Sequence, residues 1–299
     1  MMRKIMSKFL PLFLILFLLD SSLYVRSALS QSQKAFLWKA QSKTGIVYVL
    51  GSLHLMKKEA YPLNAKIETA FEKSNVLAVE ANINDIAKMD LHKLMQNAFY
   101  PGNETLERHV SKETYELIKK ETVGLGMPLE LIIKQKPWFL SLTLTSLELM
   151  KLGFDPNYGI DNYFLRKSMG KKKIVELESI DYQLSLLSGF SDREQELFLL
   201  HTLRDMRTIG QEIDTLLRAW TSGDVRGIES LLLKGAENRG MEQVYEKLFY
   251  ERNKNMASKI EEFLKTRETY FVVIGSGHLV GNRGITEILK KKGYIVEQM

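Results

Sequence analysis

Residues 48–55 (YVLGSLHL) and residues 272–279 (VVIGSGHL) repeat one pattern of residue types more than 200 positions apart. In each stretch, an uninterrupted apolar run is followed by Gly-Ser-x-His-Leu. Continuous apolar runs of this length are typical of strands that are buried on both faces, as in α/β proteins. The glycine lets the backbone turn sharply where the strand ends. Each histidine is therefore predicted to lie at the carboxyl edge of a sheet, where open α/β sheets bind ligands.

Further strand-like and helical segments surround these two stretches. Other runs of strand length are residues 36–40, 75–80 (NVLAVE), 173–177 (KIVEL) and 294–297. The first of them and residues 46–50 flank a turn at residues 42–45, which predicts a hairpin. Apolar residues recur with helical spacing in residues 64–73, 85–152, 180–266 and 285–292.

This order of segments predicts the fold class. Strands separated by helices indicate an α/β fold, with a central sheet formed by N- and C-terminal segments and large helical insertions in the middle of the chain. No Pro/Gly/Ser-rich linker divides residues 31–299. We therefore expect these residues to form a single domain.

The composition excludes several classes of protein. The chain has 299 residues, of which 45% are hydrophobic and 26% charged, and it contains no cysteine. This balance is unlike that of disordered, collagen-like or coiled-coil chains. The absence of cysteine excludes a disulfide framework, thiolate metal ligands and a cysteine nucleophile.

The first 30 residues have the pattern of a secretory signal. Arg3, Lys4 and Lys8 precede an apolar run of 11 residues, 9–19. As a helix, this run rises roughly 16 Å, about half of a bilayer core. Ala28 and Ser30 fit a cleavage site for signal peptidase, which predicts a mature start near Gln31. An uncleaved anchor is the alternative, although Pro11 and Asp20 would shorten a spanning helix. We expect export to the bacterial envelope or beyond, with no membrane span after cleavage.

The net charge gives little support for nucleic-acid binding. Residues 1–30 contain four basic residues and one acid, so their removal lowers the formal charge from +6 to +3. No remaining run of basic residues is longer than three. We therefore expect no nucleic-acid partner.

His54, His278 and Glu80 are the candidate site residues. Glu80 follows the strand-like run 75–80 and is predicted to lie at the same sheet edge as the two histidines. Two imidazoles and a carboxylate have the composition of a divalent-metal site. They also have that of a metal-free acid–base set. A structural role for either histidine is the plainer alternative, and the repetition of the whole pattern argues against it.

The glycines of residues 275–281 (GSGHLVG) also resemble a dinucleotide-binding loop. The matching stretch at Gly51 lacks the second glycine of that loop. We therefore rank nucleotide binding last.

The sequence resembles the TraB/GumN-like family, which is distantly related to the Tiki proteases. The residues that carry this resemblance occur in family order: 51–54 (GSLH), Glu80, 159–164 (GIDNYF), Leu177-Glu178 with Gln183-Leu184, 251–253 (ERN) and 275–281. The resemblance covers residues 36–299. It implies an α/β core with two Gly-x-x-His motifs and a glutamate and, in the Tiki branch, metal-dependent peptidase activity.

The resemblance adds two residues to the candidate site. Asp161 either caps the helix predicted at residues 162–169 or directs its carboxylate toward the histidines as a metal ligand. Arg252 is either solvated or, if its helix packs over the sheet edge, neutralises the oxyanion of a tetrahedral intermediate or binds a carboxylate.

Together these observations predict an extracytoplasmic metal-dependent hydrolase. His54 and His278, with Glu80 or Asp161, would bind one divalent ion, for which zinc, manganese and cobalt are all candidates. Glu80 could instead act as the general base, beside His54 and Arg252 as catalytic residues. A peptide or another small acyl compound is the expected substrate. A metal-free His/Glu ester hydrolase and a non-catalytic envelope accessory or ligand-binding protein are the alternatives, and the sequence predicts no oligomeric state.

Overall fold

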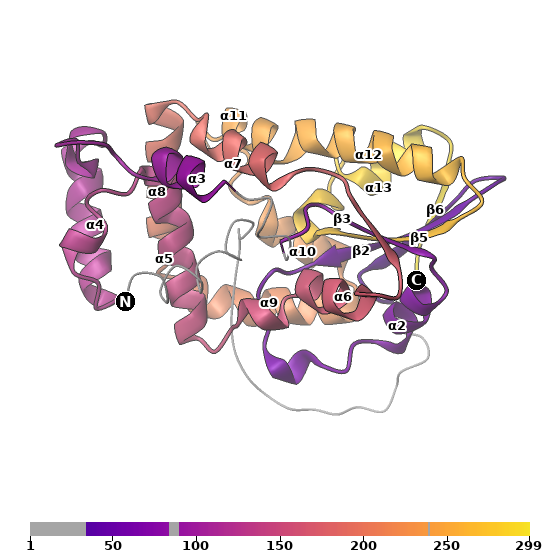
Figure 1. Cartoon of the computed structure of the whole chain (residues 1–299). Coiled ribbons are helices and arrows are strands. Elements are labelled where there is room, and N and C mark those ends of the chain that lie inside the picture. Colours follow the sequence, from indigo (N-terminus) through magenta and orange to yellow (C-terminus); the bar gives the residue numbers. More distant parts are fainter. Residues whose placement is uncertain (1–33, 84–89, 239) are drawn as a thin grey trace.

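A computed structural model describes residues 34–83, 90–238 and 240–299 of the chain (Figure 1). The signal peptide predicted for residues 1–30, with its cleavage near Gln31, lies outside these residues. In the described part of the chain, no helix is long and apolar enough to cross a membrane.

The centre of the fold is a six-stranded mixed sheet with the strand order β4-β3-β5-β2-β1-β6. The strands are β1 (Leu37–Gln41), β2 (Ile46–Ser52), β3 (Val76–Val79), β4 (Lys173–Glu176), β5 (Thr269–Gly275) and β6 (Ile295–Gln298). β2, β3, β4 and β5 run parallel to one another, and β1 is antiparallel to both β2 and β6. The predicted hairpin at the N-terminus and the predicted α/β fold class are both confirmed.

The register of β2 against β5 explains why the two repeated motifs meet. Ser52 pairs with Gly275, so the repeats end side by side with an offset of one residue. Gly51 is required at its position, because a Cβ there would lie 2.3 Å from the ring of Phe36. β3 pairs with the other side of β5, with Val79 opposite Val273, and its carboxyl end reaches the same edge.

Helices cover both faces of the sheet. α2 (Ala65–Glu72) and α6 (Ile160–Ser168) lie on one face, and α12 (Glu251–Leu264) and α13 (Ile285–Lys291) lie on the other (Figure 1). Under α2 and α6 the rings of Phe71, Phe164 and Phe271 contact one another, with centroids 4.8–5.5 Å apart. Burial of these large rings contributes strongly to the core.

The remaining helices belong mainly to the middle of the chain. They are α3 (Leu91–Ala98), α4 (Lys112–Gly124), α5 (Pro137–Lys151), α7 (Ile180–Ser188), α8 (Asp192–Asp205), α9 (Ile209–Ser222), α10 (Val225–Leu232) and α11 (Glu242–Tyr245). Short 3₁₀ helices occupy Lys58–Ala60, Leu106–Arg108, Leu129–Leu131, Pro156–Tyr158 and Ser276–His278, and a π-helix, η7, occupies Glu246–Tyr250. α3, α4, α5 and α8 extend the molecule beyond the carboxyl edge of the sheet (Figure 1).

Candidate functional site

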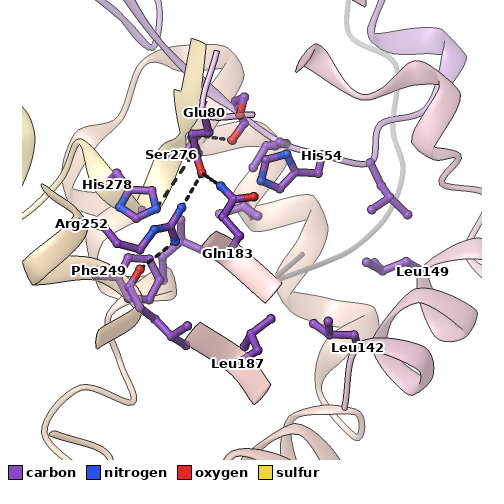
Figure 2. A pocket seen from close by; sticks show the side chains of 18 of the residues that line it. His54, Glu80, Leu142, Leu149, Gln183, Leu187, Phe249, Arg252, Ser276 and His278 are labelled. Atoms are coloured by element: carbon purple, nitrogen blue, oxygen red, sulfur yellow. Dashed lines mark hydrogen bonds and ion pairs between the residues drawn. The ribbon is translucent and has the colours of Figure 1, made fainter. Parts of the chain in front are cut away.

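Four acidic or imidazole side chains follow the carboxyl ends of the four parallel strands. His54 follows β2, Glu80 follows β3, Glu178 follows β4 and His278 follows β5. Parallel strands end at one edge of a sheet, so residues far apart in sequence meet there. Figure 2 shows His54, Glu80 and His278 around one space.

The ring of His54 is oriented by Asp161. The Nδ1 atom of His54 lies 2.7 Å from Oδ2 of Asp161, which is buried in the first turn of α6. A carboxylate is favoured there by the helix dipole. Gly159 allows the start of α6 to lie close to the backbone of His54, because a Cβ at position 159 would lie 2.2 Å from the carbonyl oxygen of His54. The other ring nitrogen, Nε2, faces Gly275, where a Cβ would lie 3.7 Å away.

The ring of His278 is oriented by Asn253 in α12. His278 Nδ1 lies 2.6 Å from Oδ1 of Asn253, and Nδ2 of Asn253 donates a hydrogen bond to the carbonyl of Arg283 at 2.9 Å. This second bond fixes which end of the amide faces the imidazole. Because the amide oxygen only accepts, Nδ1 of His278 carries the hydrogen, and Nε2 presents its lone pair to the site.

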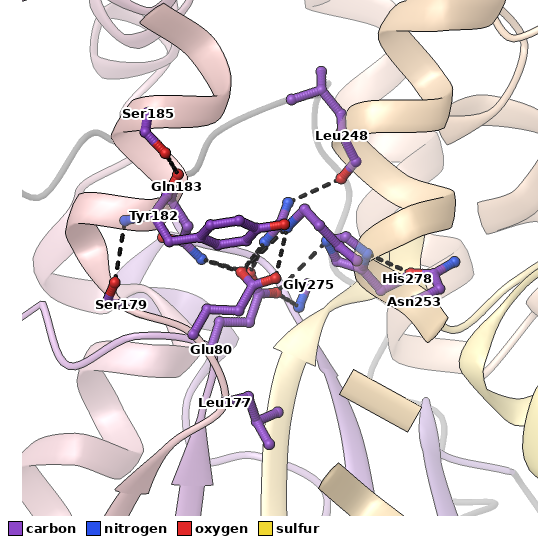
Figure 3. A network of polar contacts seen from close by, with 12 residues as sticks. Glu80, Leu177, Ser179, Tyr182, Gln183, Ser185, Leu248, Asn253, Gly275 and His278 are labelled. Atoms are coloured by element: carbon purple, nitrogen blue, oxygen red, sulfur yellow. Dashed lines mark hydrogen bonds and ion pairs between the residues drawn. The ribbon is translucent and has the colours of Figure 1, made fainter. Parts of the chain in front are cut away.

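Glu80 is almost completely buried, with 2% of its surface exposed, and both of its carboxylate oxygens accept hydrogen bonds. Oε1 accepts from the backbone N–H of Gly275 at 2.6 Å. Oε2 accepts from Nη2 of Arg252 at 2.7 Å and from Nε2 of Gln183 at 3.2 Å. Figure 3 shows this network of polar contacts.

Arg252 lies between two carboxylates. Its Nε and Nη2 atoms donate to Glu178 at 2.7–3.1 Å, Nη2 also donates to Glu80, and Nη1 donates to the carbonyl of Leu248 at 2.9 Å. Gln183 connects the same two carboxylates, because its amide also donates to Glu178 at 2.9 Å. A buried guanidinium with this many partners is fixed in position.

The two histidines differ in their affinity for protons. Burial lowers the pKa of His278 well below its ordinary value, and the charge of Arg252 lowers it further. Burial also acts to lower the pKa of His54, but the charge of Asp161 and the hydrogen bond to it outweigh this effect and raise the pKa. Burial acts to raise the pKa of Asp161, but the charge of His54 and the hydrogen bonds from His54 and Ser52 together outweigh it, so the pKa of this carboxyl is lowered.

Burial raises the pKa of Glu80, against the opposing charge of Arg252. Because the pKa of His278 lies well below its ordinary value, this residue is neutral at neutral pH and acts as a hydrogen-bond acceptor at Nε2.

The donor atoms at the sheet edge fit part of a metal site. Nε2 of His278 and Oε1 of Glu80 face each other at 3.9 Å, and both are acceptors. This separation is compatible with two ligands of one divalent ion, whose bonds to nitrogen and oxygen are about 2.0–2.2 Å long. Each histidine is also held at Nδ1 by a second residue, as is usual for metal-binding imidazoles. Within residues 34–83, 90–238 and 240–299, however, no group of three or more His, Asp or Glu side chains is arranged to hold a metal ion.

A cavity of about 100 Å³ adjoins these side chains. Its polar lining includes His54, Glu80, Gln183, Arg252 and His278. A reacting group placed in this cavity would contact both histidines and the carboxylate.

All five predicted site residues lie close to this edge. His54, Glu80, Arg252 and His278 line the cavity, and Asp161 contacts it through the ring of His54. The predicted site omitted Glu178, Gln183 and Asn253, which orient Arg252, Glu80 and His278. Glu178 carried a usable signal, because it follows a strand as Glu80 does. Gln183 and Asn253 lie within helices, so their positions gave no such indication, and only the family resemblance, which includes both residues, pointed to them.

Comparison with known proteins shows the family of this chain. A sequence model of the TraB/PrgY/gumN family matches residues 36–298. The chain belongs to this family. The resemblance carried by the two Gly-x-x-His motifs is thereby confirmed.

Individual relatives of this TraB/PrgY/gumN family protein are distant. The uncharacterized protein YbaP of Escherichia coli (strain K12) is 24% identical over 244 residues, which cover 81% of this chain and 87% of YbaP. An uncharacterized protein of Treponema pallidum (strain Nichols) is 23% identical, covering 89% of this chain and 83% of the relative. A protein named metalloprotease TIKI homolog, from Nematostella vectensis, is 22% identical over 88% of this chain and 66% of its own length. No solved structure matched the chain significantly.

Proposed function

We propose that this TraB/PrgY/gumN family protein is a metal-dependent hydrolase of acyl bonds, with peptides as the first substrate class. The observation that carries the proposal is the pair of facing acceptors, His278 Nε2 and Glu80 Oε1, at the edge where His54 also lies. Two acceptors that face each other in a buried site are stabilised by a cation between them. The distant relationship to proteins named metalloproteases supports the same class of reaction.

In this proposal His54, His278 and Glu80 would hold a zinc, manganese or cobalt ion. A divalent ion supplies a water of lowered pKa and polarises the scissile carbonyl. Asp161 and Asn253 keep Nε2 of each imidazole directed into the site. Direct metal ligation by Asp161 and general-base action by Glu80 remain predictions.

Arg252 has a defined position in this scheme. It keeps Glu80 in place and offsets the negative charge of Glu80 and Glu178. Its predicted contact with a tetrahedral oxyanion also remains a prediction, as does export through residues 1–30.

A metal-free ester hydrolase is the second candidate function, and the contact between His54 and Asp161 favours it. A carboxylate 2.7 Å from Nδ1 fixes the tautomer in which Nε2 of His54 accepts a proton from water. In this scheme Asp161, and not Glu80, orients His54, because Glu80 bonds to Arg252, Gln183 and Gly275.

The testing experiment is elemental analysis of the chain from Gln31 onward, prepared without a polyhistidine tag. Samples are reconstituted in parallel with zinc, manganese and cobalt. We expect near-stoichiometric metal in the parent and its loss in a folded His54→Ala/His278→Ala variant.

The matched control for this experiment is His92→Ala/His109→Ala, which removes two histidines that do not line the cavity and should keep the metal. Absence of metal from the parent after all three reconstitutions would refute the metal-dependent mechanism. Ester substrates would then test the metal-free alternative. Retention of the cellular phenotype in the His54→Ala/His278→Ala variant would indicate a non-catalytic binding role.

A further inference from the structure

The cavity beside the candidate site has two chemically different sides. One side consists of the polar residues at the strand ends, such as His54 and Glu80. The other side consists of apolar side chains, including Leu142, Leu149 and Leu187, which face the same space in Figure 2. A ligand that fills the cavity therefore has a polar end and an apolar end.

The apolar side is built by the helical segments in the middle of the chain. α5 contributes Leu142 and Leu149, which are two helical turns apart and hence on one face. α9 contributes Ile213, and η7 contributes Phe249, whose ring centroid lies 5.2 Å from that of His278. The apolar lining thus begins directly beside a candidate metal ligand.

The charged side chains in the described lining already have partners. Glu80 is paired with Arg252, and the charge of Arg252 is shared with Glu178. The described lining residues from α5, α9 and α10 carry no charge. A charged substrate group placed against these helices would be buried without a partner, which is strongly unfavourable.

The cavity has room for an apolar side chain. A water molecule needs about 10–15 Å³ of such volume, and the cavity has about 100 Å³. This is enough for a branched aliphatic or aromatic side chain.

We infer that the site selects acyl substrates with an uncharged, leucine- to phenylalanine-sized group next to the scissile bond, and that Leu142 and Leu149 determine this specificity. The inference rests on the proposed function. In the reaction, the bond from the carbonyl carbon to nitrogen breaks, a bond from that carbon to the oxygen of water forms, and the leaving amine takes up a proton. The apolar group remains against α5 throughout.

A set of matched peptides tests the inference. Protein produced from the full-length chain is supplied with zinc, manganese or cobalt and incubated with N-acetylated Gly/Ala peptides. Each peptide contains one variable residue: Leu, Phe, Ala, Asp or Lys. Cleavage next to this residue is followed by mass spectrometry. We expect kcat/KM for the Leu and Phe peptides to exceed that of the Ala peptide by at least about tenfold, with no detectable cleavage next to Asp or Lys.

Variants in α5 test the residues that would determine the specificity. Leu149→Phe narrows the cavity and should lower the Phe-to-Ala ratio of kcat/KM by about tenfold. Leu142→Ala widens it and should change the Leu-to-Phe ratio in favour of Phe. Leu144→Ala is the matched control, because Leu144 lies on the same helix but packs in a separate core cluster. These ratios do not depend on the fraction of each variant that folds.

A binding measurement distinguishes failure of this inference from failure of the proposed function. The hydroxamates of the five variable amino acids used in the peptides (Leu, Phe, Ala, Asp and Lys) are tested for their effect on the thermal unfolding temperature of the protein. Selective stabilisation by the Leu and Phe compounds, without cleavage of any peptide, would support the inference and contradict the hydrolase. Equal cleavage or equal binding across the series would overturn the inference, as would identical ratios in Leu142→Ala, Leu149→Phe and the control.

Discussion

Removal of the guanidinium of Arg252 should destabilise the protein far more than removal of an exposed arginine. Arg252→Met keeps most of the aliphatic part of the side chain and deletes the donors to Glu80, Glu178 and the carbonyl of Leu248. Glu80 is 2% exposed and Glu178 is 9% exposed, so two carboxylates would be left close together without a cation.

The size of the effect follows from this burial. Breaking a buried ion pair by removing one partner costs about 3–5 kcal/mol of the free energy of unfolding. The second carboxylate places this variant at the upper end of that range. The double variant Arg252→Met/Glu178→Gln should recover about 0.5–3 kcal/mol, because one of the uncompensated charges is gone.

Urea unfolding followed by circular dichroism measures these differences, with chelator present so that the metal-free proteins are compared. Arg207→Met is the control, because Arg207 is 55% exposed in its ion pair with Glu121 and its loss should cost at most about 1 kcal/mol. The m-value should be unchanged in all variants. A loss in Arg252→Met no larger than that in Arg207→Met would refute the argument that this buried cation stabilises the sheet edge.

Three further predictions concern the histidines and the glycine beside them. Because the folded-state pKa of His278 is depressed, this residue contributes stability that is present above its unfolded pKa of about 6.5 and lost as the pH falls. Between pH 7.5 and 5.5, metal-free His278→Gln should therefore lose about 1.4 kcal/mol less than the parent in urea titrations, and equal losses would contradict the assigned pKa. In ¹⁵N NMR spectra of metal-free protein at neutral pH, His278 should be protonated at Nδ1, and Asn253→Ala should produce a mixture of tautomers with the fold retained; an unchanged spectrum would show that Asn253 does not set the tautomer. Gly159→Ala should cost about 1–3 kcal/mol in thermal unfolding, because its Cβ would lie 2.2 Å from the carbonyl oxygen of His54; wild-type stability in this variant would contradict the close packing of α6 against His54.

The sequence by itself determined the strands and the identity of the central site residues. The apolar runs that lead to Gly51 and Gly275 are local patterns, and a strand that is buried on both faces requires them. His54, His278 and Glu80 could be placed at one edge because the carboxyl ends of parallel strands meet. The helical middle of the chain was equally evident from its periodicity.

Only the tertiary structure decided how the site residues are connected. Arg252 and Glu178 are 74 positions apart, and Asn253 and His278 are 25 apart. Their contacts depend on how α12 packs over the sheet. The apolar side of the cavity was likewise not evident from the sequence, since Leu142 and Leu149 belong to a helix that is apolar almost all round. A periodic pattern shows that such side chains are buried, whereas the packing of neighbouring helices determines which of them line a cavity.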